Sequence, residues 1–258
     1  MPELLDFLNS HASVRHFTDQ DIRIDDELTI CLTAERSPTS SNLHAYSIIS
    51  VRDQSVKQTL ARLCGDQEHV ATCPLFLVFC ADLYRLSLLA KERGYPFHGE
   101  YAEMFIVATV DAALAGGRAL IAAQALGLAG VMVGGVRSKI EETSNLLGLP
   151  EWVYPVMGMS LGYPARPAKP RPRLPLRGLL FRERYDTGAI APAVKEYDQI
   201  MDQAGHLKGR EVEKERYPRF DGVYSWSEHA ARRLASEAPG SLRPHMLGYL
   251  QKQGFLKR

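Results

Sequence analysis

Residues 100–128, EYAEMFIVATVDAALAGGRALIAAQALGL, are the stretch that decides the fold of this sequence. Apolar and small residues fall on nearly every side of the helix that the stretch predicts. A helix that is apolar on nearly every side is normally buried on nearly every side. We therefore expect this helix to lie at the centre of the fold, with the other elements packed around it.

Two adjacent glycines, Gly116 and Gly117, lie inside this predicted helix. Each glycine destabilises a helix by about 0.5–1 kcal/mol relative to alanine. Three interpretations remain open: a tolerated weakness, the close approach of a second helix such as the symmetry mate in a dimer, or a flat ring lying against the glycines. We favour the dimer contact.

Short patterned segments precede the long helix. Asp25, Asp26 and Glu27 favour the first turn of a helix, because carboxylates stabilise helix N-termini. Residues 75–81 form a short, continuous apolar run after a proline, which indicates a buried central strand. The expected elements before the long helix are helices at 3–10, 25–36 and near 84–93, a loop at 38–42, and strands at 46–51 and 75–81.

Residues 129–139, AGVMVGGVRSK, predict a short strand, paired glycines and then a helix. This order resembles dinucleotide-binding sites, but the G-x-x-x-G-G spacing is not G-x-G-x-x-G. No acidic residue at the expected distance closes a βαβ unit, so we reject a Rossmann domain. Gly130, Gly134 and Gly135 would let the backbone lie against a flat ligand with a free N–H; a tight strand-to-helix turn is the alternative.

The next predicted strand begins at Trp152 and ends at Gly162, and a segment rich in proline and cations follows at 165–175, ARPAKPRPRLP. Proline removes backbone donors and stiffens the chain. In extended geometry Arg171 and Arg173 would project from the same side, where they suit a phosphate monoester. A solvated linker is the alternative.

The composition is that of an ordinary globular protein, with 258 residues, 45% hydrophobic, 24% charged and a net charge of +1. A chain so close to neutral implies neither nucleic acid nor an anionic membrane as its partner. No run of about 18 apolar residues lacks a charge or a glycine, and no secretory signal is visible, so we expect no membrane span and a cytoplasmic protein. Without CxxC spacing, Cys31, Cys64, Cys73 and Cys80 are expected to be buried free thiols in a reducing cytosol.

Residues 11–19, HASVRHFTD, crowd two imidazoles, a hydroxyl and a guanidinium after an amphipathic N-terminal segment. Ser13 and Arg15 can point the same way from an extended turn. A hydroxyl donor and a planar cation suit a phosphate or an electron-rich ring edge. The cluster is a weak signal alone, because most Ser-x-Arg triplets are solvated surface.

Other segments join this cluster in an order and spacing that is typical of one family. They are Ser40-Ser41 before Tyr46-Ser-Ile-Ile, Gly65-Asp-Gln67-x-His-Val, Phe79-Cys-Ala-Asp82, Asp111-Ala-Ala, Gly130-Val-x-x-Gly-Gly135-x-Arg, Leu161-Gly-Tyr-Pro with Arg171-Pro-Arg-Leu-Pro175, and Trp226-Ser-Glu-His with Arg243-Pro. Over nearly its whole length the chain resembles the FMN-dependent nitroreductases, specifically the oxygen-insensitive NADPH nitroreductases and NADPH–flavin oxidoreductases.

The resemblance implies an α+β, nitroreductase-like fold, with a mixed central sheet around the long buried helix. It implies an FMN-binding core over residues 1–189 and, in the same domain, a helical C-terminal extension over 190–258 that wraps the core or the partner subunit. It also implies a homodimer with two FMN sites at the interface, lined by residues of both chains.

The resemblance also assigns roles to individual residues. His11, Arg171 and Arg173 would hold the FMN phosphate, with Ser13 near the phosphate or the ribityl chain. Arg15 and Gln67 would face the pyrimidine edge of the flavin, where a cation stabilises the anionic reduced form. The remaining cofactor contacts would come from Ser40, Ser41, Gly130, Val131, Gly134 and Gly135.

The substrate side is implied in the same way. Arg243 would reach the substrate pocket and Asn42 its lip, and a charged loop would recognise the 2′-phosphate of NADPH through Lys208, Arg210, Arg216 and Arg219. Three glutamates are interleaved in that loop, so a solvated face is the alternative. Other departures from the family pattern are Ala12 where Arg is common, Arg171 where Lys is usual, and Asn42 and His44 where an aromatic and an amide are usual.

The implied reaction is ping-pong: NAD(P)H, with NADPH as the expected donor, passes a hydride to N5 of FMN and is replaced by an electron acceptor. Nitroaromatics, quinones and related small aromatic molecules would take two electrons at once, with no side-chain nucleophile or base. A flavin reductase or an NAD(P)H oxidase is the alternative reaction. A non-catalytic flavin-binding dimer is the third interpretation.

Overall fold

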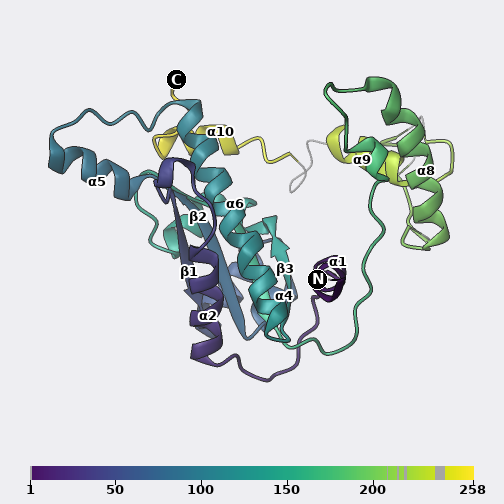
Figure 1. The fold of residues 1–258 in the computed structure, drawn as a ribbon, viewed down its shortest axis with the longest axis horizontal. Helices are drawn as coiled ribbons and strands as arrows, with labels where there is room; N and C mark the ends of the chain where they lie inside the picture. The colour runs from purple at the N-terminus through teal and green to yellow at the C-terminus, as the bar shows by residue number, and fades with distance from the viewer. Residues whose placement is uncertain (1, 208, 214, 218–219, 236–241) are drawn as a thin grey trace. The chain divides into compact units, whose positions relative to one another are not determined.

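The computed structural model describes residues 2–207, 209–213, 215–217, 220–235 and 242–258. These residues form two compact units (Figure 1). Unit 1 comprises residues 1–169 and 243–258, and unit 2 comprises residues 170–242. The last residues of the chain therefore group with the N-terminal body, whereas the sequence placed them in the extension.

Unit 1 is built on a four-stranded sheet in the order β1-β2-β4-β3. All three strand pairings among the described residues are antiparallel, so the α+β class is confirmed but the expectation of a mixed sheet was wrong. Because each of these pairs runs in opposite directions, no parallel crossover is needed within the sheet. The strands are β1 (Tyr46–Val51), β2 (Leu75–Asp82), β3 (Ala129–Val133) and β4 (Val153–Gly162).

Strand β2 lies inside the sheet and is buried along its whole length, as its continuous apolar run predicts. Alternate side chains of a strand point to opposite faces. Leu77 and Phe79 therefore join the core on one face, whereas Phe76 and Val78 join a second core on the other. Helices α3 (Gln54–Leu63) and α4 (Glu68–Thr72) contribute to the second core.

Helix α6 (Ala102–Ala125) packs along the first face of the sheet, beside α2 (Ile24–Glu35) (Figure 1). Its sheet-facing side carries small residues such as Ala112, Ala115 and Ala119, which are fully buried. Small side chains let the helix backbone lie close to the strands. Among the described helices only α6 is long and apolar enough to cross a membrane by length and composition, and here it is a core helix packed on a sheet.

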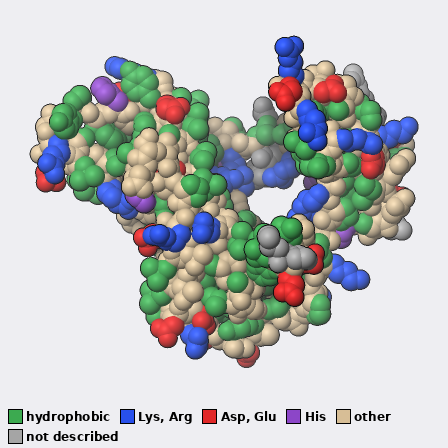
Figure 2. Space-filling model, viewed as in Figure 1, with side chains coloured by type: hydrophobic (Ala, Val, Ile, Leu, Met, Phe, Trp, Pro, Cys, Tyr) green, Lys and Arg blue, Asp and Glu red, His purple; other side chains and the backbone are tan. Residues whose placement is uncertain are grey.

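The expectation that α6 is buried on nearly every side was wrong for the single chain. Ile106, Val110, Leu114 and Ile121 are 42–53% exposed, and their spacing places them on one helix face. Helix α2 adds a second exposed apolar row (Ile24, Leu28 and Leu32). Figure 2 shows hydrophobic side chains exposed on the side of unit 1 where these two helices lie.

The two helix glycines face in different directions. A Cβ on Gly116 would lie 3.3 Å from Sδ of Met157 and 3.4 Å from the ring of Phe79, so Gly116 faces the sheet. A Cβ on Gly117 would have no described atom within 4 Å. The described part of the chain therefore gives no packing reason for a glycine at 117.

The remaining elements of unit 1 agree with the predicted pattern. Helices expected at 3–10, 25–36 and 84–93 occur as α1 (Pro2–Asn9), α2 and α5 (Tyr84–Arg93). The paired glycines open a short 3-10 turn, η2 (Gly134–Arg137), and α7 (Ile140–Leu146) and α10 (Met246–Lys252) complete the unit. All four cysteines are free; three are buried as expected, whereas Cys31 is partly exposed.

Unit 2 has a small core of its own. Tyr197 and Met201 of α8 (Ile190–Gln203) are buried with Leu207, and Trp226 of α9 (Trp226–Ala235) packs against them. Ser227, in the first turn of α9, donates from its backbone N–H and its hydroxyl to Asp198 of α8. The polar, helical character expected for this part of the chain is confirmed.

Candidate functional site

The N-terminal segment that carries His11, Ser13 and Arg15 runs along the ends of β3 and β4. The backbone N–H of Val14 donates to the carbonyl of Gly130 at 3.0 Å, and that of Thr18 donates to Tyr163 at 2.9 Å. Phe17 forms a β-bridge with Pro164. The structure thus brings the predicted phosphate and ring-edge residues against the predicted glycine-rich strand.

Several polar groups of this segment have hydrogen-bonding capacity that the described residues do not use. Nε2 of Gln124, near the end of α6, lies 3.2 Å from Nδ1 of His11, and no described residue contacts Nε2 of the same ring. Ser13 and Arg15 are exposed. Neither of their side chains has a hydrogen-bond or ion-pair partner among the described residues.

Gln67 lies next to this segment and is held at both ends of its amide. Its Nε2 donates to the carbonyl of Cys64 at 2.7 Å, and its Oε1 lies 3.0 Å from Nε2 of His69. A Cβ on Gly135 would lie 2.5 Å from Nε2 of Gln67, so only glycine leaves room for this arrangement. The predicted ring-edge residue and the predicted glycine turn are in direct contact.

His69 and Ser160 belong to this cluster and received no role from the sequence. Nδ1 of His69 lies 3.0 Å from Oγ of Ser160, which sits in the apolar strand β4. Burial, and then the positive charges of Arg15 and His16, lower the pKa of His69 to about 4. A serine inside an otherwise apolar strand was the available signal, because buried polar groups require partners.

The other predicted glycine-strand residues have structural neighbours of their own. Gly130 is buried, and a Cβ there would lie 2.7 Å from both the carbonyl of Ser160 and the side chain of Leu161. Val131 is buried in the core. A Cβ on Gly134 would meet the guanidinium of Arg137 at 3.2 Å.

Ser40, Ser41 and Asn42 form a short 3-10 turn, η1, in another part of unit 1. The buried carboxylate of Asp111 in α6 accepts from the backbone N–H of Ser40 and of Ala45, both at 3.1 Å. Ser41, Asn42 and His44 all have positive φ, between 49° and 57°. A loop with three left-handed non-glycine residues is strained, and such strain is common at functional sites.

The two groups of predicted cofactor residues are far apart in one chain. Asp111 holds the Ser40 loop, and Gln124 contacts His11. These two positions of α6 are separated by thirteen helical steps, which correspond to about 20 Å along the helix axis. One chain does not bring Ser40 and Ser41 to the His11–Arg15 segment.

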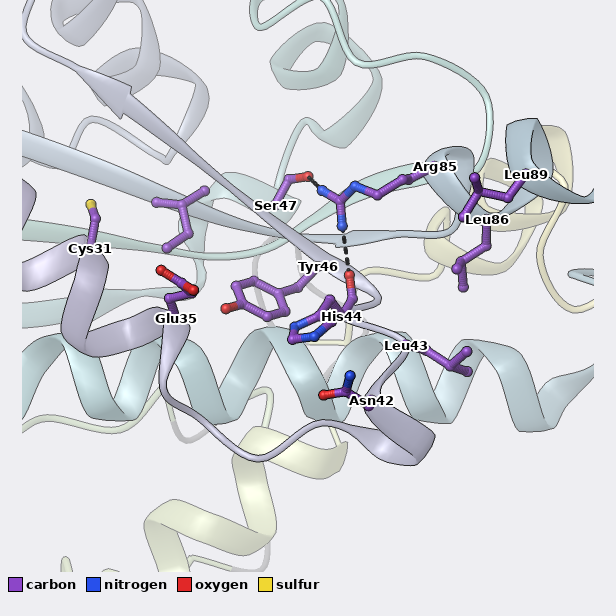
Figure 3. A pocket seen from close by; sticks show the side chains of 11 residues that line it. Cys31, Glu35, Asn42, Leu43, His44, Tyr46, Ser47, Arg85, Leu86 and Leu89 are labelled. Carbon is purple, nitrogen blue, oxygen red and sulfur yellow. Dashed lines mark hydrogen bonds between the residues drawn. The ribbon is translucent and has the colours of Figure 1, made fainter. Parts of the chain in front are cut away.

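A cavity of about 780 Å³ adjoins the strained loop (Figure 3). The guanidinium of Arg85 lines this cavity and donates to the carbonyl of His44 at 2.8 Å. Asn42, predicted at the lip of the substrate pocket, lines this cavity. The lining residues are Cys31, Glu35, Asn42, Leu43, His44, Tyr46, Ser47, Ile48, Arg85, Leu86 and Leu89.

The other predicted cations belong mostly to unit 2. Arg171 and Arg173 are exposed, and Nη1 of Arg173 donates to the carbonyl of Arg171 at 2.9 Å. Arg210 lies 5.9 Å from the ring centre of Tyr224, and Arg216 lies 5.6 Å from that of Tyr217. Lys208 and Arg219 lie outside the described residues.

Arg243 is the exception, because it belongs to unit 1. Its Nε and Nη2 each lie 3.4 Å from Oγ of Ser138, just after the glycine turn. Burial raises the pKa of the Cys64 thiol to about 12, and the charge of Arg243 opposes that rise. Arg243 therefore lies near the Cys64–Gln67 end of the cluster.

Comparison with known proteins agrees with this geometry. The model of the nitroreductase family matches residues 8–163, and that of the nitroreductase family C-terminal domain matches residues 171–258. An oxygen-insensitive NADPH nitroreductase of Salmonella typhimurium is 33% identical over 100% of both chains. An FMN reductase (NADPH) of Bacillus subtilis is 31% identical, also over 100% of both chains.

Solved structures give the same result at the level of the fold. A nitroreductase from B. subtilis superposes with a TM-score of 0.87 at 32% identity, covering 98% of this chain and 99% of the other. An NADPH:FMN oxidoreductase from Vibrio harveyi, solved with NAD+, gives 0.85 at 29% identity, with 98% and 99% covered. The chain therefore belongs to the nitroreductase family.

Proposed function

We propose that this protein is an FMN-dependent NAD(P)H oxidoreductase that reduces nitroaromatics, quinones or related small aromatic acceptors. The observation that carries the proposal is the cluster in which Gln67 contacts Gly135 and His69, with Arg15 close enough to His69 to lower its pKa, so that a cation and an amide donor lie together. Its relatives are named nitroreductase, FMN reductase and NADPH–flavin oxidoreductase.

The residues present fit FMN. The Cβ positions of Gly130 and Gly135 are filled by atoms of the chain itself, so glycine is needed there for close packing around β4 and Gln67, and the fit to FMN rests on the polar groups. An electron-rich ring edge needs donors, and Arg15 has no partner among the described residues. A phosphate needs donors and cations, which His11, Ser13, Arg171 and Arg173 supply in this proposal.

Bound FMN would supply the two-electron hydride chemistry that connects NAD(P)H with the acceptor. The task of the chain is then to bind, orient and tune. Arg15 places a positive charge at the pyrimidine edge, and Gln67 donates a hydrogen bond there. His69 carries no charge near neutral pH because of its low pKa, so the local field comes from Arg15 and not from the imidazole.

The functional unit in this proposal is a homodimer with two FMN sites. Ser40 and Ser41 would reach the flavin of the partner subunit, because about 20 Å of helix separates their loop from the His11 segment of the same chain. The exposed apolar rows of α2 and α6 supply a surface to bury. In the same arrangement the predicted extension would pack over the core or the partner, except for residues 243–258, which group with unit 1.

The electron donor in this proposal is NADPH in preference to NADH. Several relatives carry NADPH in their names. Lys208, Arg210, Arg216 and Arg219 would recognise the 2′-phosphate, whereas Asn42 and Arg243 would line the substrate pocket. We place the protein in the cytoplasm as a soluble enzyme, in agreement with its free thiols.

The test is a visible spectrum of the purified protein, followed by anaerobic titration with NADPH and with NADH. We expect a flavin spectrum that bleaches faster with NADPH and recovers when a quinone or a nitroaromatic is added. Recovery with free FMN or oxygen alone would instead identify a flavin reductase or an oxidase. A protein that binds no flavin after incubation with FMN would overturn the proposal.

A further inference from the structure

A series of hydrogen bonds connects the core of unit 1 with the candidate site. Ser160 on β4 contacts His69, and His69 contacts Gln67. Gln67 in turn donates to the carbonyl of Cys64. Ser160 is fully buried and His69 is 8% exposed, so the inner end of this series of hydrogen bonds is buried.

The donor in each of these hydrogen bonds can be assigned from one group whose role is fixed, the carbonyl of Cys64. The carbonyl of Cys64 only accepts, so the Gln67 atom beside it is the amide nitrogen and the atom beside His69 is the amide oxygen. The amide oxygen also only accepts, so the proton of the His69 ring is on Nε2. Nδ1 is then bare, and it accepts from the hydroxyl of Ser160.

This assignment determines what Gln67 offers to a ligand. Its oxygen is occupied by His69, and one of its two N–H bonds is occupied by Cys64. Among the described residues the second N–H has no acceptor. Together with the Arg15 guanidinium, which only donates, Gln67 presents donors alone.

We propose that His69, anchored by Ser160, is a positioning residue that locks the Gln67 amide so that only N–H donors face the pyrimidine edge of the bound flavin. The inference rests on the proposed function for the identity of the ligand. Reduced FMN carries negative charge at that edge, so a fixed donor stabilises the reduced form more than the oxidised form. A free amide could turn its oxygen toward the same edge and repel it.

The variants separate the two hydrogen bonds of the ring. In His69→Gln the side-chain nitrogen can replace Nε2 and keep the donor to Gln67. In His69→Asn the shorter amide can reach Ser160 but not Gln67. Ser160→Ala removes the anchor, and Thr143→Val is its matched control, because Thr143 is also a fully buried hydroxyl of unit 1 and has no partner among the described residues.

The first measurement uses the FMN-free protein and long-range ¹H–¹⁵N NMR of the histidine rings. We expect the His69 ring to be neutral at pH 7 with its proton on Nε2. A proton on Nδ1 would overturn the lock whatever the protein binds.

The second measurement is the affinity of each variant for oxidised and for reduced FMN, with the midpoint potential of the bound flavin. We expect His69→Asn to weaken oxidised FMN about threefold and reduced FMN about tenfold, which lowers the potential, because one hydrogen bond is lost at a site where charge develops. His69→Gln should restore both affinities, and Thr143→Val should change neither. Ser160→Ala should follow His69→Asn with a smaller effect.

Equal weakening of both redox forms by His69→Asn would identify a merely structural histidine and would overturn the proposal. The same holds if His69→Gln and His69→Asn behave alike. Wild-type protein that binds no FMN would overturn the proposed function, whereas normal FMN binding with an Nδ1-protonated ring would overturn the lock alone.

Discussion

The two parts of the candidate cofactor site are built in opposite ways. The Gln67–His69–Ser160 cluster is a set of hydrogen bonds between the start of α4 and the buried strand β4, whereas the Ser40–His44 loop is exposed, has three left-handed residues and is held by the carboxylate of Asp111 and the guanidinium of Arg85. The cluster is rigid in a single chain, but the loop lies about 20 Å away along α6. In the proposed homodimer a second chain would bring the two parts together.

The largest expected effect comes from removing the carboxylate that holds the Ser40–His44 loop. Asp111→Ala leaves the N–H groups of Ser40 and Ala45 without their acceptor in a buried place, and should destabilise unit 1 by about 2–4 kcal/mol. Chemical denaturation would measure the loss. Asp111→Asn keeps one acceptor and should cost less; equal costs for both variants would show that the two hydrogen bonds do not hold the loop.

The next prediction concerns the proposed dimer interface, which would bring the Ser40–His44 loop and the Gln67–His69–Ser160 cluster together. Ile121 is 43% exposed on the outer face of α6, and Ile121→Asp would bury a carboxylate in the proposed interface. We expect dimer dissociation to become at least about a hundredfold more favourable by analytical ultracentrifugation. Glu103→Gln, at an exposed position in the first turn of the same helix, serves as the control. A variant that remains dimeric would move the interface away from this face of α6.

The pH dependence of stability tests the Gln67–His69–Ser160 cluster. The low pKa of His69, about 4, arises from burial and from the nearby charges of Arg15 and His16. The unfolded chain has a histidine pKa near 6.5, so it binds the proton more readily than the folded chain between these two values. Stability should therefore be complete above about pH 7 and fall by roughly 3 kcal/mol as the pH drops through 6.5 toward 4. Thermal melts of wild type and His69→Gln should converge at low pH; parallel curves would rule out a titrating His69.

Gly135→Ala tests the Gln67–His69–Ser160 cluster by adding a methyl group, without removing any polar group. A Cβ at this position would meet Nε2 of Gln67 at 2.5 Å and the carbonyl of Cys64 at 2.6 Å. We expect the variant to displace the Gln67 amide and to weaken FMN binding about tenfold, with a smaller loss of stability. Gly148→Ala, at a position with open space but positive φ, is the control that affects stability without affecting FMN.

The smallest expected effect is that of Gly117→Ala. No described atom of the same chain lies within 4 Å of the added methyl group, and helix propensity alone would stabilise the chain by about 0.5–1 kcal/mol. We expect instead that the variant weakens the dimer a few-fold, because a partner helix approaches there. A more stable dimer would contradict the close approach that the sequence suggested.

Much of the fold could be predicted because local patterns are strong in this chain. The continuous apolar run of β2 and the helix at 84–93 occur where expected, since periodicity and helix boundaries depend on neighbouring residues. The antiparallel pairing of every described strand could not be predicted in the same way, because pairing is decided by contacts between distant segments. The exposure of one face of α6 was not predicted, for a related reason. An apolar pattern indicates burial, but it does not say whether the covering atoms belong to the same chain.

The sequence by itself determined the elements, the family resemblance and the chemical types at the site, because residue identity sets hydrogen-bonding capacity and charge. Only the tertiary structure showed that His69 and Ser160 lie behind Gln67, and that the Ser40 loop is remote from the His11 segment. His69 and Ser160 are 91 residues apart in the chain, so no local pattern connects them. Their partnership arises from the packing of α4 against the sheet, which decides which polar groups must satisfy one another once water is excluded.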